Sequence, residues 1–491
     1  MEKLITIYDS IYKKKIILNL FVIFSICIVI GASIAINTIV AFAIVICLLF
    51  LILNVLNKDF LQWTAIGSGV FANIGILRVD LLDIRLIQFL WLAVVTIKII
   101  DCMIKKKITK IDLSKSDRYL ILYILIYIIS LFFAVDKKTS LIETLQTIGL
   151  GAIYLYISKS IDTHKKLYKS IKILIYTGSV FILCGIFQKF FSFSMLPQIQ
   201  INNFESINFT LTELRHNSII YGQNVERSGA LFFHFVATGC IVSQLLILMI
   251  GSLENKQISD FSKLFNTIFI LLGLALLFFT QSRAAVLAFG FGFVLLSLTK
   301  EKNKKGYIFI FIVGSIVFLF SSISIRLHEV INEGINASTI EQHLVIWAIA
   351  IRMILEKPLF GYGGGYFITY SGNLGPLVHI FGIKGWVGDG AACHNIILQT
   401  TAEIGILGSL FLTIFLFYHI KKPLLFVFKR RNISHKWMIS SLLMSSIVGI
   451  LINFISNHFT REIFWIILGL SSAAFNIYSK QKEQIAAVKN S

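Results

Sequence analysis

Charged residues and prolines are scarce in this chain. Only 14% of its 491 residues are charged and only four are proline, whereas 56% are hydrophobic and the mean hydropathy is +0.82. A soluble protein of this length would be about a quarter charged. The composition therefore excludes a soluble globular protein, and the long apolar runs predict an all-α polytopic membrane protein.

Cysteine pairs are missing as well. The six cysteines stand singly along the chain, as Cys27, Cys47, Cys102, Cys184, Cys240 and Cys393. A typical zinc site needs ligands a few residues apart, and a disulfide framework needs a regular series of cysteines. The sequence therefore gives no sign of a metal site. No second feature supports Cys393, beside His394, as a thiol nucleophile.

Acidic residues are few relative to basic ones, with 25 Asp and Glu against 45 Lys and Arg and a net charge of +20. In a soluble protein this excess would suggest a nucleic-acid partner. Between membrane spans, the same charge orients the protein and gathers on the cytoplasmic side. We therefore expect no nucleic acid among the partners.

Fourteen apolar stretches are candidates for crossing a bilayer. A bilayer core of about 30 Å requires about 20 apolar residues in a helix. The stretch at 61–77 contains small and polar residues, and two others are short, so twelve spans is the alternative. The fourteen stretches are 16–35, 39–56, 61–77, 86–104, 119–135, 141–158, 171–191, 229–252, 266–280, 284–299, 307–322, 395–418, 437–456 and 461–478.

Lysine and arginine orient these spans. If both termini are cytoplasmic, the cytoplasmic segments hold 31 of the 45 basic residues and the opposite side holds 13, with Lys98 left inside a span. This is the asymmetry that the positive-inside rule describes. The sequence therefore predicts a multi-pass membrane protein with both termini in the cytoplasm.

The topology divides the chain into five parts. Apolar helices fill residues 1–191, 229–322 and 395–491, and the last part ends in a short basic tail. The two remaining segments, 192–228 and 323–394, are long and are predicted to lie outside the cytoplasm. Long loops on a rigid scaffold commonly carry function, so we expect functional residues in or beside them.

An amphipathic helix and a glycine-rich turn lie in the second outer segment. Pro358 and the turn GYGGG follow a helix predicted over 341–356. Backbone N–H groups of such a turn, here those of Gly363 and Gly365, can bind phosphate oxygens. A plain turn between two elements is the alternative. The helix is predicted from the spacing of Leu344, Trp347, Ala348, Ile351 and Leu355.

Two arginines stand at the outer ends of predicted spans. Arg227 precedes the span at 229–252, and Arg283 occupies the tight hairpin between the spans at 266–280 and 284–299. The positive-inside rule disfavours arginine at such places. A guanidinium group matches phosphate oxygens with two parallel hydrogen bonds, so both are candidate phosphate ligands. The alternative is that each anchors its helix at the membrane surface.

The stretch HNIILQTTAEIGILG at 394–408 places polar residues at the head of an apolar span. An imidazole can act as a general base near neutral pH, so His394 is a candidate catalytic residue, with a helix cap shared with Asn395 as the alternative. Glu403 lies half a turn away and about 13 Å deeper on a straight helix. We therefore interpret Asn395 and Glu403 as structural, with Lys98 as a candidate partner for the carboxylate.

These stretches resemble the signature motifs of one family. HNIILQTTAEIGILG resembles the HNxxLQxxxExGxxG signature of the O-antigen ligase and polymerase superfamily. PLFGYGGGYF at 358–367 resembles its glycine-rich stretch, and ERSGALFF at 226–233 and SRAA at 282–285 resemble its two arginine motifs. The four matches stand in the family's order across residues 226–408.

The resemblance implies a bacterial membrane glycosyltransferase with GT-C-like architecture, which agrees with the 12–14 transmembrane helices counted above. Such enzymes work on the outer face of the cytoplasmic membrane without a nucleotide sugar, a metal or another cofactor. They transfer a glycan from undecaprenyl diphosphate to an acceptor sugar. By position, His394 would activate the acceptor hydroxyl, and Arg227 and Arg283 would hold the diphosphate.

Two positions depart from the family's pattern. The arginine that commonly stands four residues before the tryptophan of the outer helix is replaced by His343, ahead of Trp347. The Pro-Asn pair that commonly follows the first arginine motif is also missing. Arg215, Arg352 or His343 itself would then supply the lost substrate contact.

We therefore predict a polysaccharide polymerase whose partners are a lipid-linked glycan donor, a glycan, lipid or protein acceptor, and membrane lipid. A ligase that attaches the glycan to lipid A-core or to a protein is the first alternative, because the motifs serve both. A transporter of the lipid-linked glycan is the second, and a non-catalytic scaffold is the third. A transporter would show repeat symmetry and polar residues at mid-membrane, whereas the histidine and arginines here crowd one face.

Overall fold

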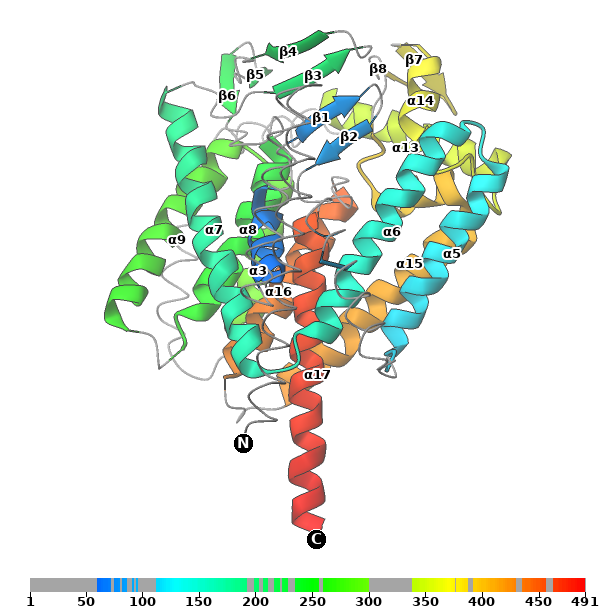
Figure 1. Cartoon of the computed structure of the whole chain (residues 1–491). Coiled ribbons are helices and arrows are strands. Elements are labelled where there is room, and N and C mark those ends of the chain that lie inside the picture. Colours follow the sequence, from blue (N-terminus) through cyan, green and yellow to red (C-terminus); the bar gives the residue numbers. More distant parts are fainter. Residues whose placement is uncertain are drawn as a thin grey trace, which may run out of the picture. The chain divides into compact units, whose positions relative to one another are not determined.

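The protein is described from a computed structural model (Figure 1). The chain divides into two units, Met1–Thr64 and Ala65–Ser491, and all of the described residues except 60–64 belong to the second unit. The predicted spans at 16–35, 39–56 and 307–322, and most of 86–104, lie outside the described residues. The described residues are 60–71, 75–79, 82–85, 91, 94–95, 112–191, 198–202, 206–210, 216–220, 223–227, 235–255, 259–299, 338–375, 377–386, 392–429, 435–455 and 462–490.

Long apolar helices dominate the part of the chain that the structure describes. Seven of them are long and apolar enough to cross a membrane: α5 (Lys115–Phe133), α6 (Lys137–Ser160), α7 (His164–Phe191), α9 (Asp260–Thr280), α15 (Ile396–Lys429), α16 (Lys436–Ile455) and α17 (Glu462–Asn490). Two shorter apolar helices accompany them, α8 (Phe235–Ser252) and α10 (Arg283–Leu298). The predicted all-α polytopic membrane protein is confirmed, and each of the nine helices overlaps a predicted span.

The span predicted at 61–77 is wrong. Helix α3 covers only Phe60–Ser68, a 3-10 turn covers Gly69–Phe71, and strand β1 (Gly75–Val79) begins inside the predicted span. Nine helical residues rise about 14 Å, which is about half the thickness of a bilayer core. Glycine and serine are poor helix formers, and they end the helix here.

Short strands form in the loop segments. The hydropathy pattern predicts apolar helices, and it did not predict these strands. One sheet has the order β2-β1-β3-β4, in which β1 and β3 are parallel and the other neighbours are antiparallel. Two separate hairpins are β5-β6 and β7-β8. The strands beyond β1 are β2 (Leu82–Arg85), β3 (Gln198–Asn202), β4 (Ser206–Thr210), β5 (His216–Ile220), β6 (Gln223–Arg227), β7 (Leu377–Ile380) and β8 (Ile383–Trp386).

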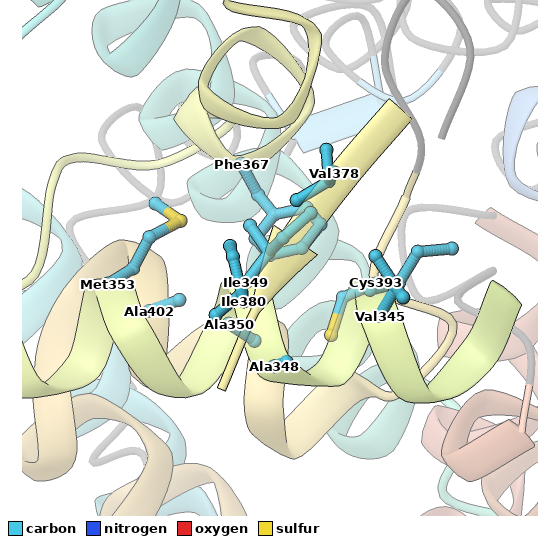
Figure 2. Packing of buried hydrophobic residues seen from close by; sticks show 11 residues of the cluster. Val345, Ala348, Ile349, Ala350, Met353, Phe367, Val378, Ile380, Cys393 and Ala402 are labelled. Atoms are coloured by element: carbon cyan, nitrogen blue, oxygen red, sulfur yellow. The ribbon is translucent and has the colours of Figure 1, made fainter. Parts of the chain in front are cut away.

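The predicted amphipathic helix is present as α13 (Ser338–Glu356), which is followed by the short helix α14 (Tyr366–Asn373). Together with β7, β8 and the start of α15 they enclose a small apolar core, in which Phe367 of α14 points onto α13 (Figure 2). The core consists of Val345, Ile346, Ala348, Ile349, Ala350, Met353, Phe367, Val378, Ile380, Cys393 and Ala402. Cys393 is therefore a packing residue.

The face of α13 that packs inward differs from the predicted one. Val345, Ile349 and Met353 are fully buried, whereas Ile351 is 43% exposed and Leu355 is 68% exposed. Helix α13 is thus apolar on two faces, because a second stripe remains uncovered within the described part of the protein. Spacing alone could not distinguish these two faces.

Helix α15 is broken at Gly405, whose φ is positive and whose ψ is that of an extended chain (φ 80°, ψ 176°). The glycine-rich turn after α13 enters the break. Tyr362 N donates to Ala402 O over 3.1 Å, Gly363 N donates to Glu403 O over 2.7 Å, and Ile406 N donates to Pro358 O over 2.9 Å. In an unbroken helix the carbonyls of Ala402 and Glu403 would accept from the N–H groups four residues on, and Ile406 N would donate to Ala402 O. The turn therefore replaces hydrogen bonds that the helix has lost.

Glycine is required on both sides of this joint. A Cβ atom at Gly361 would overlap the Glu403 carbonyl, and one at Gly405 would overlap the Leu359 carbonyl. Both residues also have positive φ, which an L-amino acid with a side chain adopts only at a cost. The turn also contacts the connection between α5 and α6, because Val135 N donates to Tyr362 O over 2.9 Å.

We predict that Gly405→Ala destabilises the protein by about 2–4 kcal/mol, through backbone strain and overlap at the joint. Gly290→Ala in α10 is the matched control, because a Cβ there has open space and Gly290 has no positive φ. Thermal unfolding of the purified variants in one detergent measures both. Equal thermal unfolding midpoints for the two variants would contradict the proposed role of Gly405 in joining the turn to α15.

Candidate functional site

His394 stands two residues before the start of α15 and has a left-handed backbone (φ 54°). This conformation is uncommon for residues other than glycine, so its surroundings must hold it. Asn395 caps the helix, since its Oδ1 accepts from Ile397 N over 3.0 Å and from Leu398 N over 3.1 Å. Cys393 on the other side is buried in the apolar core. His394 is thus fixed between a packed residue and a capped helix.

Gln399 links this corner to Glu403. Its Oε1 accepts from Cys393 N over 3.3 Å, and its Nε2 donates to Glu403 Oε1 over 3.0 Å. The same Glu403 oxygen accepts from Phe367 N over 3.3 Å, and Gly365 N also donates to this carboxylate. Glu403 therefore joins α14 to α15, and it reaches the residue before His394 through Gln399. The other suggested partner, Lys98, lies outside the described residues.

His343 of α13 lies beside His394, with 5.4 Å between the ring centroids and an angle of 74° between the planes. The ring of Trp347 lies 6.2 Å from that of His343. Both His343 Nδ1 and Trp347 Nε1 are buried, and neither has a hydrogen-bond partner among the described residues. The surroundings of the His343–His394 pair thus contain two buried nitrogens whose hydrogen-bonding capacity is not met by the described residues.

Burial sets the charge of this pair. It lowers the pKa of His394 from 6.5 to about 4, and the neighbouring His343 lowers it further. Burial also lowers the pKa of His343, and the positive charge of Arg283 adds to this effect. Both imidazoles are therefore neutral at pH 7, and each has a nitrogen that can accept a proton.

Arg283 is the first residue of α10, directly after its N-cap Ser282. The preceding Gln281 is left-handed (φ 54°), which closes the α9–α10 hairpin within three residues. This hairpin brings the guanidinium near enough to His343 to act on it electrostatically. The structure thus gathers Arg283, His343 and His394, three of the residues predicted from the sequence.

The other predicted residues lie elsewhere or are not described. Arg227 ends strand β6, where its backbone pairs with His216, and Arg215 lies outside the described residues. Arg352 stands nine residues beyond His343, which is half a turn round α13 and about 13 Å along it. Its Nε donates instead to Glu356 over 3.0 Å. Arg352 therefore does not lie beside His343, and a contact of Arg352 with the substrate stays a prediction.

The phosphate-binding prediction for Gly363 and Gly365 is also corrected. Gly363 N donates to the Glu403 carbonyl and Gly365 N to the Glu403 carboxylate, so both N–H groups are occupied. A Cβ at Gly363 would overlap Ser140, and one at Gly365 would overlap Glu143. These glycines allow the turn to pack between α6 and α15. Among the described residues, no three His, Cys, Asp or Glu side chains gather as metal ligands would.

Sequence reasoning missed Gln399 and the orphan nitrogen of Trp347. Gln399 stands four residues from both Asn395 and Glu403, so all three lie on one face of α15. That spacing was the available signal for the connection. Trp347 was interpreted only as part of an apolar stripe, because spacing does not reveal an unpaired N–H group.

Fold and site together define a membrane protein with a half-buried histidine pair that lies within electrostatic range of an arginine. A protein-family model described as O-antigen ligase matches residues 268–413. The match confirms the resemblance to the O-antigen ligase and polymerase superfamily, and the matched region contains Arg283, His343 and His394. A search of curated proteins found no match to this chain.

We predict that His394 makes the protein sensitive to mild acid. Its folded pKa of about 4 lies below its ordinary 6.5, so the unfolded chain binds the extra proton first and stability falls as the pH drops from 6.5 towards 4. His394→Gln should show a smaller loss of thermal midpoint between pH 7 and pH 5 than the wild type. His379→Gln, which removes an exposed imidazole from β7, is the control. If His394→Gln lost as much thermal midpoint between pH 7 and pH 5 as the wild type, the lowered pKa of His394 would be contradicted.

Proposed function

We propose that this protein of the O-antigen ligase and polymerase type is a glycosyltransferase that polymerises surface polysaccharide. It transfers an undecaprenyl-diphosphate-linked glycan to an acceptor sugar at the outer face of the bacterial cytoplasmic membrane. The observation that carries the proposal is the group formed by His394, His343 and Arg283. It combines a neutral proton acceptor with a fixed positive charge, the two elements that displacement of a diphosphate requires.

His394 is the proposed general base. The acceptor hydroxyl oxygen attacks the anomeric carbon of the donor, its proton passes to the imidazole of His394, and the bond to the diphosphate oxygen breaks. A base with a pKa of about 4 is weak at neutral pH. An anionic diphosphate bound near the histidine pair would favour the imidazolium and raise this pKa. The donor itself therefore strengthens the base.

Arg283 is the proposed partner of the leaving group, with Arg227 from the first loop segment as a second candidate. Negative charge builds up on the diphosphate as the glycosidic bond breaks, and a fixed guanidinium offsets it without a metal ion. His343 is neutral, so it offers one N–H donor where relatives commonly carry arginine. It is a weaker anion ligand than arginine, and it also avoids a second positive charge next to His394.

The alternative function is that of a ligase, which would use lipid A-core or a protein as acceptor. The same base and the same leaving-group contact serve both reactions, since only the acceptor differs. We propose a polymerase rather than a ligase because polymerases are the more widespread of the two enzymes. The acceptor is therefore an explicit variable of the test below.

Purified protein in lipid nanodiscs, supplied with undecaprenyl-diphosphate-linked repeat units from its own host and no nucleotide sugar, tests the proposal. We expect a ladder of longer lipid-linked glycans that persists in the presence of a chelator. His394→Ala should lower the rate by about 10²–10⁴-fold, the usual contribution of a positioned base. His379→Ala is the control.

Product formation only after lipid A-core or a protein acceptor is added would assign a ligase. A His394→Ala protein that transfers glycan at the wild-type rate would refute the proposed base. A wild type that binds the donor but forms no product with any acceptor would favour the transporter.

We also predict that Gln399→Leu lowers kcat by about 10–100-fold with little change in KM. The substitution removes both hydrogen bonds between Glu403 and the backbone beside His394, so the base is misplaced while the substrate contacts stay. Thr413→Val is the control, because the Thr413 hydroxyl donates to Ser409 O in its own helix and has no other hydrogen bond among the described residues. A wild-type kcat for Gln399→Leu would show that the capped helix alone positions His394.

A further inference from the structure

Three tyrosines form a cluster near the end of α13. This cluster has no part in the reaction proposed above. Tyr362 and Tyr366 are stacked, with ring centroids 5.8 Å apart and an interplanar angle of 2°. Tyr370 lies edge-on to both, at 5.3 Å from Tyr362 and 6.4 Å from Tyr366. We call these three residues the tyrosine platform. Its inner side packs against the apolar core of α13, and each ring is partly exposed.

Charged residues fix the platform in place. The hydroxyl groups of Tyr362 and Tyr370 both donate to Glu356 Oε2, the second over 3.4 Å. Arg352 Nε donates to the other oxygen of Glu356, and Lys357 Nζ lies 4.6 Å from the centre of the Tyr362 ring. The hydrogen bonds from Tyr362 and Arg352 lower the pKa of Glu356, so its carboxylate is ionised. The hydroxyl groups of Tyr362 and Tyr370 are thus committed to the protein.

We propose that the tyrosine platform binds the glycan chain at sugar residues away from the reacting bond. Sugar rings carry C–H groups on one face, and these pack against the electron-rich face of an aromatic ring. The charged neighbours Arg352 and Lys357 can donate hydrogen bonds to sugar hydroxyl groups. This inference rests on the proposed function, which supplies a glycan on the same side of the membrane.

The position of the platform fits a chain that extends from His394. Arg352 lies about 13 Å along α13 from His343, and Glu356 lies about 20 Å from it. A single sugar at the reacting centre would not reach that far, whereas a chain of several sugars would. The platform would therefore favour longer glycans over single repeat units.

A membrane-surface aromatic belt is the competing interpretation. Ile351 and Leu355 lie on a neighbouring face of α13 and are exposed, which suits contact with lipid. In such a belt, however, tyrosine hydroxyl groups reach the headgroups, whereas here two of the three bond to Glu356. The ionised Arg352–Glu356 pair on the same surface also favours a hydrated partner.

The test measures binding in a protein that cannot transfer glycan, so its outcome is independent of the proposed reaction. His394→Ala protein in nanodiscs is titrated with lipid-free fragments of the host's surface polysaccharide, of one repeat unit and of several. We expect fragments of several repeats to bind about tenfold more tightly than single repeats, the scale of one or two stacked rings. Adding Tyr366→Ala should remove this advantage, and adding Tyr366→Phe should keep it.

Tyr366 suits the test because its hydroxyl takes no part in the described bonds to Glu356, so the network survives its loss. Equal affinity of long fragments for the proteins with Tyr366 and with Tyr366→Ala would overturn the platform. An equal loss for single repeats and for longer fragments would also overturn it, since it would indicate general damage. A loss of thermal stability in nanodiscs but not in detergent, without any change in binding, would assign the tyrosines to the membrane surface.

Discussion

The exchange of backbone hydrogen bonds at Gly405 is the interaction on which the rest of this structure depends. A helix that crosses a membrane must satisfy its N–H and C=O groups internally or from neighbouring protein. Helix α15 breaks at Gly405, and the turn after α13 supplies the missing donors and acceptor. The loop segment is therefore tied to the membrane helix through its backbone, in addition to side-chain packing.

Everything around His394 follows from that joint. The turn brings α14 against α15, so that Glu403 accepts from Phe367 and also holds Gln399. Gln399 and Asn395 then fix the backbone on either side of His394. The apolar core beneath α14 keeps α13 in place and with it His343. The proposed base is thus positioned by a polar chain on one side and an apolar core on the other.

Much of this fold could be predicted from the sequence, because length and hydropathy determine which helices can cross a bilayer. The nine described apolar helices were predicted in this way, and helix α13 was predicted from its apolar spacing. His394 was singled out by its place in a motif, and its catalytic role stays a prediction. The short helix at 60–68, the inward face of α13 and the pairing of Arg352 with Glu356 were not. Local signals for two of these were available in the sequence, since Gly67 and Ser68 end the short helix and Arg352 and Glu356 stand four residues apart on one helix. The inward face of α13 depends on which neighbours it meets in space, and periodicity carries no information about that choice. The glycine-rich turn is the clearest case, since a phosphate-binding loop and a packing joint require the same glycines.

Hydrogen–deuterium exchange of the segment 359–367, measured in lipid nanodiscs, tests the central claim most directly. We predict that the N–H groups of Tyr362, Gly363, Gly365 and Phe367 exchange as slowly as those within α15, because all four donate to that helix. Gly405→Ala should make them exchange faster. If this segment instead exchanges at the rate of an open loop in the wild type, the turn is not joined to α15, and the positioning of His394 described above is wrong.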